Sequence, residues 1–561
     1  MKIKIQLKEV FNVKKTELIS FIFLIIILII YSYIHVIHFT PAYQEVDPDG
    51  YLILAKRIAE GGPIAVKDDD PFMYQSHVWV ENDKGEIAPK FAPGYPFLMA
   101  IAYILGGDTA MFFVSPIMGG LSLIGSYMLF RLWMSRVSAL FGTFYLATNA
   151  MILVYSGYLL THASDMCFVV WGMYFLWRWK RERSTDTRKY ILISIFAGLF
   201  LGGAMTIRHT SALLILSLIS ALIIKWIDSI RSRHYPIRET LFLLVSYIIF
   251  PLMLCIYNWK IFGSPFTSGY ALSGEQDAFK LKNIPVNVRI LTAGLNYTGL
   301  FFMFPIGLIG MFLALPVSES IMSLLWIIPS YLLYSSYYWA PDGMAYFRFL
   351  IVIFPALVGL ASAMMDKSSR SWLRKAIVYL ILAGFIVFIR YNDTESALQG
   401  IVSDFPSRSL AYSAKKASEI LHDDAVIFSR RPIFCYLGTR KHFRMYDLDI
   451  FTAGYGASAF PENVEPRRQP LRNNRLREFY KGLSDNDLNN KKIELIRNFL
   501  KNGRQVAYLL PSNALSNEQN ALGSEFEWKA LDSWDLTATF VNGAWQGETW
   551  TLYEINRRVK P

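Results

Sequence analysis

The sequence predicts a multi-pass α-helical membrane protein, and its composition and the placement of its charges carry that prediction. The chain has 561 residues, of which 53% are hydrophobic and 18% are charged. A soluble domain carries about a quarter charged residues, so the deficit is large. The mean hydropathy is +0.30. The apolar residues are concentrated in long uncharged runs that are able to cross roughly 30 Å of hydrocarbon.

The first such run is Leu18–Ile34, which contains no charged residue. It is too long for the apolar core of a signal peptide and has no small-residue cleavage site, so we expect an uncleaved anchor. Further runs lie at about 109–130, 137–155, 162–177, 190–207, 210–227, 239–258, 295–316, 321–339, 345–365 and 376–389. We therefore expect about eleven transmembrane helices.

The net charge is +12, and the basic residues that cause it are placed as the predicted membrane topology requires. Lysines and arginines cluster before the first predicted span, between the fourth and fifth, after the sixth and after the tenth. All these segments are cytoplasmic if the N-terminus is cytoplasmic, as the positive-inside rule requires. We therefore expect membrane lipids as partners and no nucleic acid, with the chain in the cytoplasmic (inner) membrane.

The segment 40–92 is predicted to form an outer loop. It contains ten Asp or Glu residues against five Lys or Arg, the reverse of the basic loops. The apolar stretch Gly94–Leu105 that follows has only twelve residues, a length that favours an interfacial or re-entrant helix. Because counting it as a span would place every later basic loop outside, we predict that it does not cross.

The tail 391–561 differs in composition from the membrane domain 1–390. Helices are expected at Ser407–His422 and Leu488–Asn502, and strands at Ala425–Phe428, Val506–Leu510 and Trp550–Ile555. This alternation predicts a soluble extracytoplasmic α/β domain. The tail shows no nucleotide-binding loop or catalytic triad, so structural support or acceptor docking is favoured over catalysis.

Cysteine usage predicts no disulfide framework and no metal cluster. Cys167 and Cys255 fall in predicted spans, and Cys435 stands alone outside them. We therefore expect no metal ligands and no obligatory divalent metal.

Three carboxylates follow the first span, in the stretch Glu45-Val46-Asp47-Pro48-Asp49-Gly50-Tyr51. One interpretation is a solvated acidic turn that caps the helix-like stretch Tyr51–Glu60, because Asp is favoured at helix starts. The other is a catalytic set placed where a lipid-borne substrate presents its head group. Asp68-Asp69-Asp70 lacks spaced partners and is interpreted as solvated.

A second set of polar residues lies within or at the ends of the apolar runs, where a charge costs about 2.5–3.5 kcal/mol. Asp165 begins the fourth span, Arg208-His209 interrupts two apolar segments, Arg348 begins the tenth span and Lys90 precedes Gly94–Leu105. Snorkelling to the interface explains any one of them alone. Together, on one side of the membrane, a carboxylate and several cations suit a reaction with a phosphate leaving group.

The order of motifs resembles the GT-C superfamily of polyprenyl-phosphate-sugar-dependent glycosyltransferases. Similar groups are the protein O-mannosyltransferase-like (family 39) branch and the bacterial aminoarabinose transferase of lipid A. The resemblance covers about residues 15–365. The matching stretches are DPDGYLILAKRIAEGG from Asp47, FAPGYPFLMAIAYILGG at 91–107, SGYLLTHASD at 156–165, the turn at Arg208, YNWKIFGSPFTSGY at 257–270 and YFRFLIVIFPAL at 346–357.

The resemblance implies a role for each matching residue. Asp47 corresponds to the essential carboxylate of the first outer loop. The family often has an acidic residue next to it, where this chain has Pro48 and then Asp49, so the choice between Asp47 and Asp49 as the base stays open. The remaining residues implied to bind or order the donor are Lys90, Tyr95, Asp165, Arg208, His209 and Arg348.

The resemblance implies a GT-C-type helical bundle and an inverting hexosyl- or pentosyltransferase that acts on the outer face. The donor substrate would be a polyprenyl-phosphate sugar, without a cofactor, and the acceptor a hydroxyl or amine on a lipid, glycan or protein. The alternatives are a transporter or flippase of lipid-linked glycans and an oligosaccharide polymerase or transferase. Transporters usually show internal repeats, which this chain lacks, and the Trp-Trp-Asp signature of oligosaccharyltransferases is absent from the sequence.

Overall fold

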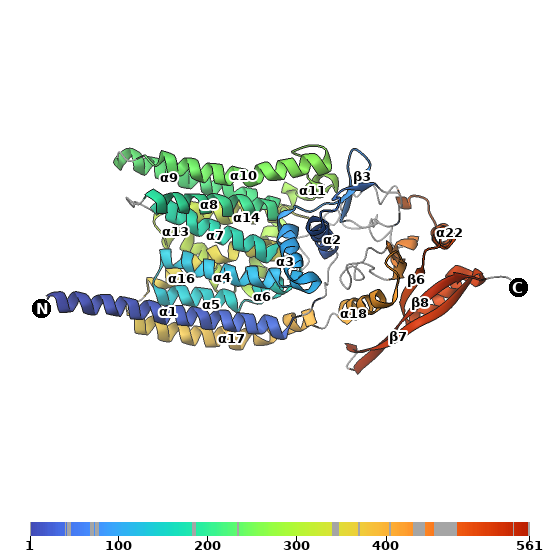
Figure 1. Cartoon of the computed structure of the whole chain (residues 1–561). Coiled ribbons are helices and arrows are strands. Elements are labelled where there is room, and N and C mark those ends of the chain that lie inside the picture. Colours follow the sequence, from blue (N-terminus) through green and yellow to red (C-terminus); the bar gives the residue numbers. More distant parts are fainter. Residues whose placement is uncertain are drawn as a thin grey trace.

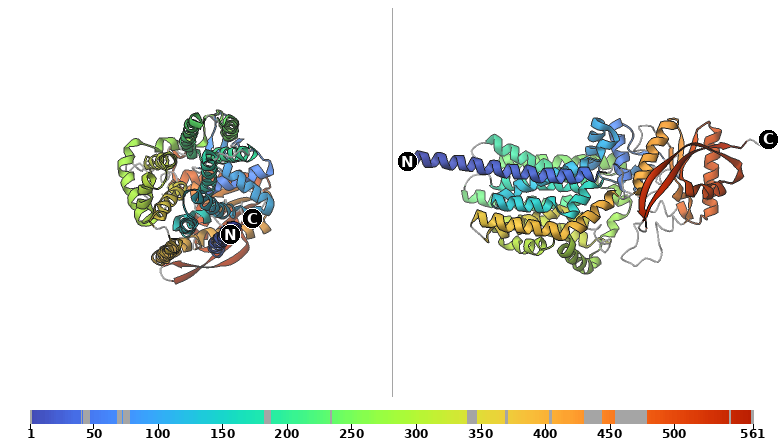
Figure 2. Two further views of the ribbon diagram at one scale, coloured as in Figure 1. Left: turned by 90° about the vertical axis from the view of Figure 1, so that its left-hand side faces the viewer. Right: turned by 90° about the horizontal axis from the view of Figure 1, so that it is seen from below.

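The computed structural model describes residues 2–39, 41, 47–67, 72, 78–181, 187–232, 235–338, 347–368, 371–402, 405–429, 444–453, 479–541 and 544–558. It consists of a long helical bundle and a C-terminal domain that contains a sheet and lies beyond one end of the bundle (Figure 1). Helix α1 (Lys2–Ile37) continues past the other end of the bundle, away from the C-terminal domain (Figures 1 and 2).

Seven helices of the bundle are long and apolar enough to cross a membrane, or up to ten if each of three bent pairs counts as one span. The protein is therefore a multi-pass membrane protein, as predicted. The elements of the bundle are α1, α4 (Val114–Trp133), α5 (Arg136–Ala147), α6 (Ala150–Gly157), α7 (His162–Arg181), α8 (Thr187–Ile207), η1 (His209–Leu214), α9 (Ile215–Ser232), α10 (Ile237–Phe262), α12 (Ile284–Gly294), η4 (Leu295–Gly299), α13 (Met303–Leu313), α14 (Val317–Ser335), η5 (Arg348–Ile353), α16 (Phe354–Asp366) and α17 (Trp372–Val402).

Each of the eleven predicted runs falls on one of these helices or bent pairs. Helix α7, the fourth predicted span, is not counted among these ten candidate spans, because polar residues at both of its ends lower its hydropathy. It nevertheless lies within the bundle (Figure 1), and 14 of its 20 residues are buried.

The stretch predicted not to cross forms α3 (Gly94–Met111), which is bent by 107° relative to α4. Helix α3 is itself kinked at Gly106-Gly107, where Gly107 has a φ of +71° that L side chains rarely adopt. The side chains of Ile104 and Leu105 are exposed. An apolar face left uncovered by protein, on a helix turned across the end of the bundle, fits the predicted interfacial position.

The bend between η4 and α13 measures 111° and frees backbone carbonyls inside the bundle. The side-chain amide of Asn149 donates to the Gly299 carbonyl at 2.8 Å, and the Tyr145 hydroxyl donates to the Leu300 carbonyl at 2.5 Å. Broken helices persist at membrane depth only where such partners replace the lost helical hydrogen bonds.

Between the bundle and the C-terminal domain lie α2 (Asp47–Glu60) and a small sheet (Figure 1). The sheet has the order β1-β3-β2 and is antiparallel, with β1 at Val66–Lys67, β2 at Trp79–Glu81 and β3 at Glu86–Pro89. These strands were not predicted from the sequence. The helix after the acidic stretch was predicted, and it begins at Asp47.

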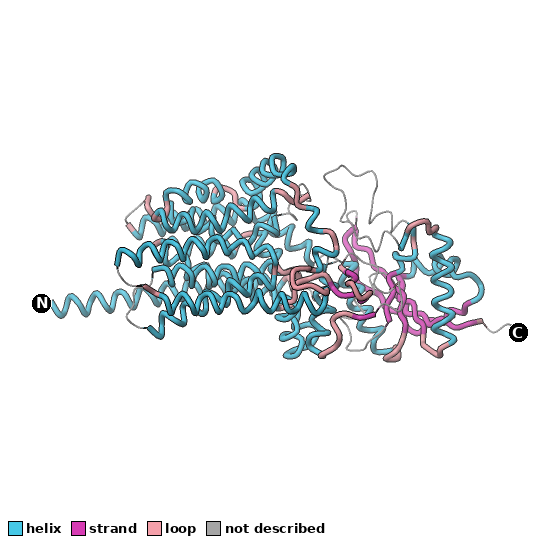
Figure 3. The backbone as a smooth tube through the Cα atoms, turned by 90° about the horizontal axis from the view of Figure 1, so that it is seen from above, coloured by secondary structure: helices cyan, strands magenta, loops and turns pink. Residues whose placement is uncertain are grey.

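The C-terminal domain contains a five-stranded mixed sheet with the order β5-β4-β6-β8-β7 (Figure 3). Strands β5, β4 and β6 run parallel, and β8 and β7 are antiparallel additions. The elements are α18 (Phe405–Ile420), β4 (Val426–Ser429), β5 (Arg444–Asp447), η6 (Leu448–Phe451), α22 (Asp485–Lys501), β6 (Val506–Pro511), α23 (Leu515–Leu522), β7 (Phe526–Val541) and β8 (Ala544–Arg557).

The predicted helices of this tail correspond to α18 and α22, and the predicted strands to β4, β6 and β8. Strands β5 and β7 were not predicted. Helix α17 runs continuously through the predicted boundary at 390/391 to Val402. Cys435 and Asp68-Asp69-Asp70 lie outside the described residues.

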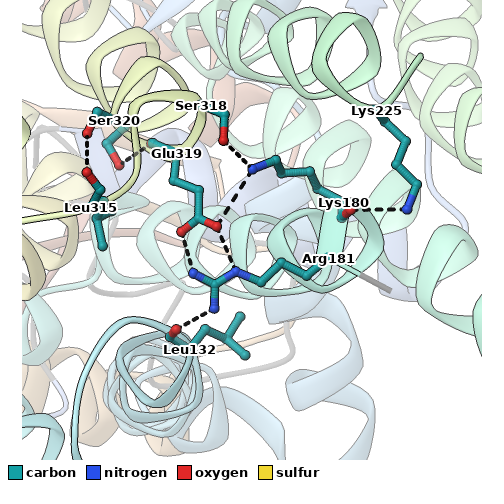
Figure 4. Close-up of polar contacts among 9 residues, drawn as sticks. Leu132, Lys180, Arg181, Lys225, Leu315, Ser318, Glu319 and Ser320 are labelled. Atoms are coloured by element: carbon teal, nitrogen blue, oxygen red, sulfur yellow. Dashed lines mark hydrogen bonds and ion pairs between the residues drawn. The ribbon is translucent and has the colours of Figure 1, made fainter. Parts of the chain in front are cut away.

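Lys180 and Arg181 form an ionic cluster around the buried carboxylate of Glu319 (Figure 4). The cluster lies at the end of the bundle remote from the C-terminal domain (Figure 1). The Arg181 guanidinium binds both carboxylate oxygens of Glu319, and Lys180 Nζ lies 3.6 Å from one of them and 2.6 Å from Ser318 Oγ. Lys225 Nζ donates to the Lys180 carbonyl at 3.0 Å. The cluster joins the end of α7 to the start of α14, and it contains cations that the topology prediction placed in the basic loops.

We expect Glu319→Gln to lower the free energy of unfolding by about 3 kcal/mol, because it removes the buried carboxylate that binds both Lys180 and Arg181. This is the lower end of the range for breaking a buried pair, since the Arg181 side chain is 34% exposed. Thermal unfolding in detergent measures the effect. Glu419→Gln is the matched control, because Glu419 is 54% exposed in its pair with Lys416 and should change stability by less than about 0.5 kcal/mol.

Candidate functional site

Asp47 is the first residue of α2, at the end of the bundle that faces the C-terminal domain (Figure 1). Asp47 and Asp49 are both partly exposed, whereas the face of α2 that carries Tyr51 and Leu52 is buried. Carboxylates in the first turn are favoured by the helix dipole. Gly50 permits close packing here, because a Cβ at that position would lie 2.4 Å from the Phe91 ring. The helix is thus packed over most of its circumference, and Asp47 lies one turn before Tyr51 on the same face.

Lys90 follows β3 directly and is buried, with 2% of its surface exposed. Its ammonium group forms an ion pair with Glu275 and lies 5.7 Å from the centre of the Tyr270 ring. Gly269 passes so close that a Cβ there would lie 2.3 Å from the Lys90 carbonyl oxygen. The loop between α10 and α12 is therefore held against the outer segment by contacts of Lys90.

Arg208 lies between α8 and η1 and is surrounded by polar partners. Its guanidinium donates to Thr161 Oγ1 at 2.9 Å and to the Tyr334 hydroxyl at 2.9 Å, and it lies 3.3 Å from His162 Nδ1. Its Nε lies 3.9 Å from an Asp165 carboxylate oxygen. A buried guanidinium needs this number of partners to offset its desolvation. These contacts connect α7, η1 and α14 at one point.

Arg348 is buried at the start of η5, and Phe349 connects it to Arg208. The two guanidinium carbons lie 5.1 and 5.4 Å from the centre of the Phe349 ring, within the range of cation–π attraction. The Phe349 ring also stacks on Tyr334 at 5.2 Å. His162 lies within electrostatic range of both arginines. The guanidinium groups of Arg208 and Arg348 therefore both lie near the Phe349 ring.

Three tyrosines, the buried Tyr51 and Tyr337 and the partly buried Tyr270, lie within electrostatic range of both Asp47 and the cations. The pKa of Tyr51 is raised by burial and then by the Asp47 charge, with Arg208 acting in the opposite direction. The pKa of Tyr270 is raised by burial, by Tyr51 and by the charges of Glu275 and Asp47, and Arg208 again opposes this.

Tyr337 extends the same connection to the second arginine. Burial raises its pKa, the charges of Glu275 and Asp47 add to that rise, and Arg348 opposes it. Asp47, Arg208, Arg348 and Glu275 therefore act on a common set of rings, and Lys90 is joined to the same set through Glu275.

The other predicted donor residues lie beside this group. Tyr95 is fully buried, its ring stands edge-on to Tyr51 at 5.3 Å, and its hydroxyl lies 2.8 Å from Ser115 Oγ. The ring of His209 stands edge-on to Tyr270 at 5.6 Å. Asp165 receives a hydrogen bond from Ser211 Oγ at 2.5 Å besides its contact with Arg208. Among the described residues, no three His, Cys, Asp or Glu side chains gather as metal ligands would.

A family model described as dolichyl-phosphate-mannose-protein mannosyltransferase matches residues 90–254. That range begins at Lys90 and includes Asp165 and Arg208. A comparison with curated protein sequences finds no match.

Solved structures extend the likeness over the chain. ArnT from Cupriavidus metallidurans bound to undecaprenyl phosphate superposes with a TM-score of 0.56 at 12% identity, over 94% of this chain and 97% of that chain. The same ArnT in the apo state gives the same values. The protein has the GT-C fold. The archaeal oligosaccharyltransferase AglB from Archaeoglobus fulgidus, in complex with an inhibitory peptide and a dolichol-phosphate, gives a TM-score of 0.47 at 13% identity, over 89% of this chain and 70% of that chain.

The resemblance to GT-C glycosyltransferases and the predicted fold class are thereby confirmed. Within the GT-C bundle, Asp47, Lys90, Arg208 and Arg348 lie at one end, and Tyr95, Asp165 and His209 contact their neighbours. The roles given to these residues remain predictions. The sequence interpretation did not single out Glu275, Thr161, His162, Tyr270, Tyr334 and Tyr337. Three of them, Thr161, His162 and Tyr270, lie inside motifs that carried the resemblance, whereas Glu275 follows Gly274 in a loop and gives no local signal.

The raised pKa values of Tyr51, Tyr270 and Tyr337 predict that folding stability is lost at alkaline pH. An unfolded tyrosine releases its proton near pH 10, whereas the folded residue retains it, so stability falls as pH rises above about 10. We expect Tyr270→Phe to reduce this alkaline loss. The test measures the unfolding midpoints of the wild type and of Tyr270→Phe, each at neutral and at strongly alkaline pH. If the midpoints of the two proteins differ by the same amount at both pH values, the raised pKa of Tyr270 is contradicted.

Proposed function

We propose that the protein transfers a sugar from a polyprenyl-phosphate donor to a hydroxyl or amine acceptor at the outer face of the cytoplasmic membrane, with inversion at the anomeric carbon. The sugar is a hexose or a pentose, and the acceptor is a lipid, a glycan or a protein. In this proposal the carboxylates Asp47 and Asp49, one of which is the base, and the C-terminal domain are extracytoplasmic. The N-terminus and the Glu319 cluster are cytoplasmic.

One arrangement supports the proposal above the others, because Asp47 lies within electrostatic range of the same tyrosines as the arginines. It shares Tyr51 and Tyr270 with Arg208, and it shares Tyr337 with Arg348. A carboxylate that faced only solvent would share no partners with Arg208 and Arg348. A site that moves a sugar off a phosphate needs a base on the acceptor side and positive charge on the leaving-group side. Both are present here within one layer of side chains at one end of the bundle.

In the proposed reaction, Asp47 accepts the proton of the acceptor group. The acceptor oxygen or nitrogen forms a bond to the anomeric carbon from the side opposite the phosphate, and the bond from that carbon to the phosphate oxygen breaks. The electron pair leaves with the polyprenyl phosphate, whose added negative charge is stabilised by the cations. Attack from the opposite side inverts the anomeric configuration.

The contacts of Arg208 and of Lys90 predict that these two cations contribute differently to phosphate binding. Arg208 is already held by Thr161, His162 and Tyr334, so its position is fixed before the donor arrives. Fixed donors are the arrangement that stabilises developing charge with little reorganisation. Lys90 is paired with Glu275, so in the proposal a bound phosphate shares its ammonium group with that carboxylate.

The resemblance to ArnT supports a lipid phosphate as the leaving group, because that protein was seen with undecaprenyl phosphate. Undecaprenyl-phosphate sugars are therefore the first donors to test. The donor tail would lie in the bilayer beside the bundle, with its head group at the end where α2 and α3 lie (Figure 1).

We expect Asp47→Asn to lower the transfer rate by about 10²–10⁴-fold, because the amide cannot accept the proton. The measurement is transfer of radiolabelled sugar from polyprenyl-phosphate donors by the purified full-length protein. Expression and the thermal unfolding midpoint should stay at the wild-type values, because Asp47 is partly exposed.

Asp49→Asn is the matched control, since Asp49 lies in the same first turn of α2. It should retain most of the transfer activity. Loss in Asp49→Asn with retention in Asp47→Asn would move the base to Asp49, and full activity in both variants would contradict carboxylate catalysis by this turn.

We also expect transfer to continue after treatment with EDTA, because in the proposal the protein's own cations take the role of a metal at the leaving phosphate. The assay is the same transfer reaction before and after chelation and dialysis. A loss of activity that Mg²⁺ or Mn²⁺ restores would show that the reaction needs a divalent metal.

A further inference from the structure

Phe72 belongs by sequence to the outer segment, between β1 and β2, yet its ring lies in the hydrophobic core of the C-terminal domain. Its side chain is 7% exposed. The other residues of that core come from the five-stranded sheet and its helices, between Val426 and Ile555. Phe72 is thus a residue of the first outer segment that is buried by the last domain of the chain.

Two aromatic rings form the Phe72 pocket. Phe451, at the end of η6, stacks on Phe72 with ring centres 4.9 Å apart and an interplanar angle of 29°. Phe479 stands edge-on to it at 5.2 Å and 89°. Aromatic pairs prefer these two arrangements, so the ring is held in orientation as well as buried.

Further contacts fix the pocket within its own domain. Phe451 contacts the ring of Phe428 in β4 at 6.1 Å, and the Tyr480 hydroxyl donates to the Ile450 carbonyl at 2.7 Å. The pocket is therefore continuous with the sheet of the C-terminal domain.

The strands on both sides of Phe72 connect it with the candidate site. Strands β1 and β2 both pair with β3, and β3 leads directly into Lys90. The Lys90 amide donates to the Val78 carbonyl at 2.9 Å. Arg57 of α2 donates to the Ile64 carbonyl at 2.9 Å and lies over the Trp79 ring at 5.6 Å. Helix α2 and Lys90 are thus joined through one small sheet, which Phe72 connects to the C-terminal domain.

We propose that Phe72 is a positioning residue for the transfer reaction, and that the C-terminal domain acts in catalysis by holding it. Docking of Phe72 fixes the three-stranded sheet. The sheet in turn keeps Lys90 and the start of α2 at fixed positions relative to Arg208 and Arg348. The catalytic part of this proposal rests on the proposed function, whereas the positioning of the outer segment does not.

A sheet of two-, three- and four-residue strands has little stability of its own, so it needs an outside support. A displacement of about 1 Å in a catalytic group costs about 10²-fold in rate. Loss of one buried ring remote from Asp47 is therefore expected to act on the reaction without removing any group that takes part in it.

Phe72→Ala in the full-length protein tests the proposal through two measurements. Hydrogen exchange should become faster in α2 and β3 and stay unchanged in bundle helices such as α7. The transfer rate per folded molecule should fall about 10²-fold, with a thermal midpoint of the bundle close to that of the wild type. Phe72→Leu should keep both the hydrogen exchange of α2 and β3 and the transfer rate closer to the wild-type values, because it retains an apolar side chain for the pocket.

Phe266→Ala is the matched control, since Phe266 lies in another loop at the same end of the bundle and is 90% exposed. It should change neither hydrogen exchange nor transfer. Unchanged exchange of α2 and β3 in Phe72→Ala would overturn the proposal, and so would full transfer activity in that variant. If the wild type transfers no sugar while Phe72→Ala speeds exchange in α2, the proposed function fails and the positioning of the segment is supported.

Discussion

The guanidinium of Arg208, whose side chain is 17% exposed, holds the outer end of the bundle together. A charge removed from water is tolerated only where opposite charge and hydrogen-bond acceptors surround it. Here Asp165 supplies the opposite charge, while Thr161, His162 and Tyr334 lie at hydrogen-bonding distance. Moving α7 or α14 away from Arg208, which directly precedes η1, would leave its charge unsatisfied, so these three elements keep a fixed relative position.

The candidate site is built outward from that fixed point. Phe349 lies between Arg208 and Arg348, and the tyrosines bring Asp47 into the same electrostatic environment. At the other ends of α7 and α14, Glu319 binds Lys180 and Arg181 (Figure 4). Ionic contacts therefore connect α7 and α14 at both ends. The predicted donor-binding residues lie at the end near Asp47.

The sequence predicts those parts of the molecule whose physical signal is local. A charge inside an apolar run is visible without a structure, which is why Asp165, Arg208 and Arg348 were found. The short apolar run of α3 predicts an interfacial helix, and in the structure this helix is bent by 107° relative to α4. Glu275 was missed because its partner Lys90 lies 185 residues earlier in the chain, and no local pattern indicates that contact. Phe72 was missed for the same reason, since a phenylalanine in an acidic loop does not show which core will bury it. Strand β5 has only four residues, too few for an alternation to stand out.

The central claim is that Asp47 and the cations Lys90, Arg208 and Arg348 bind one lipid-linked donor between them. A structure of the full-length protein with bound undecaprenyl phosphate tests this claim most directly. We expect the phosphate within hydrogen-bonding distance of at least one of the three cations, with Asp47 separated from it by the space of one sugar. A phosphate bound at another part of the bundle, with Asp47 facing away from it, would contradict the account.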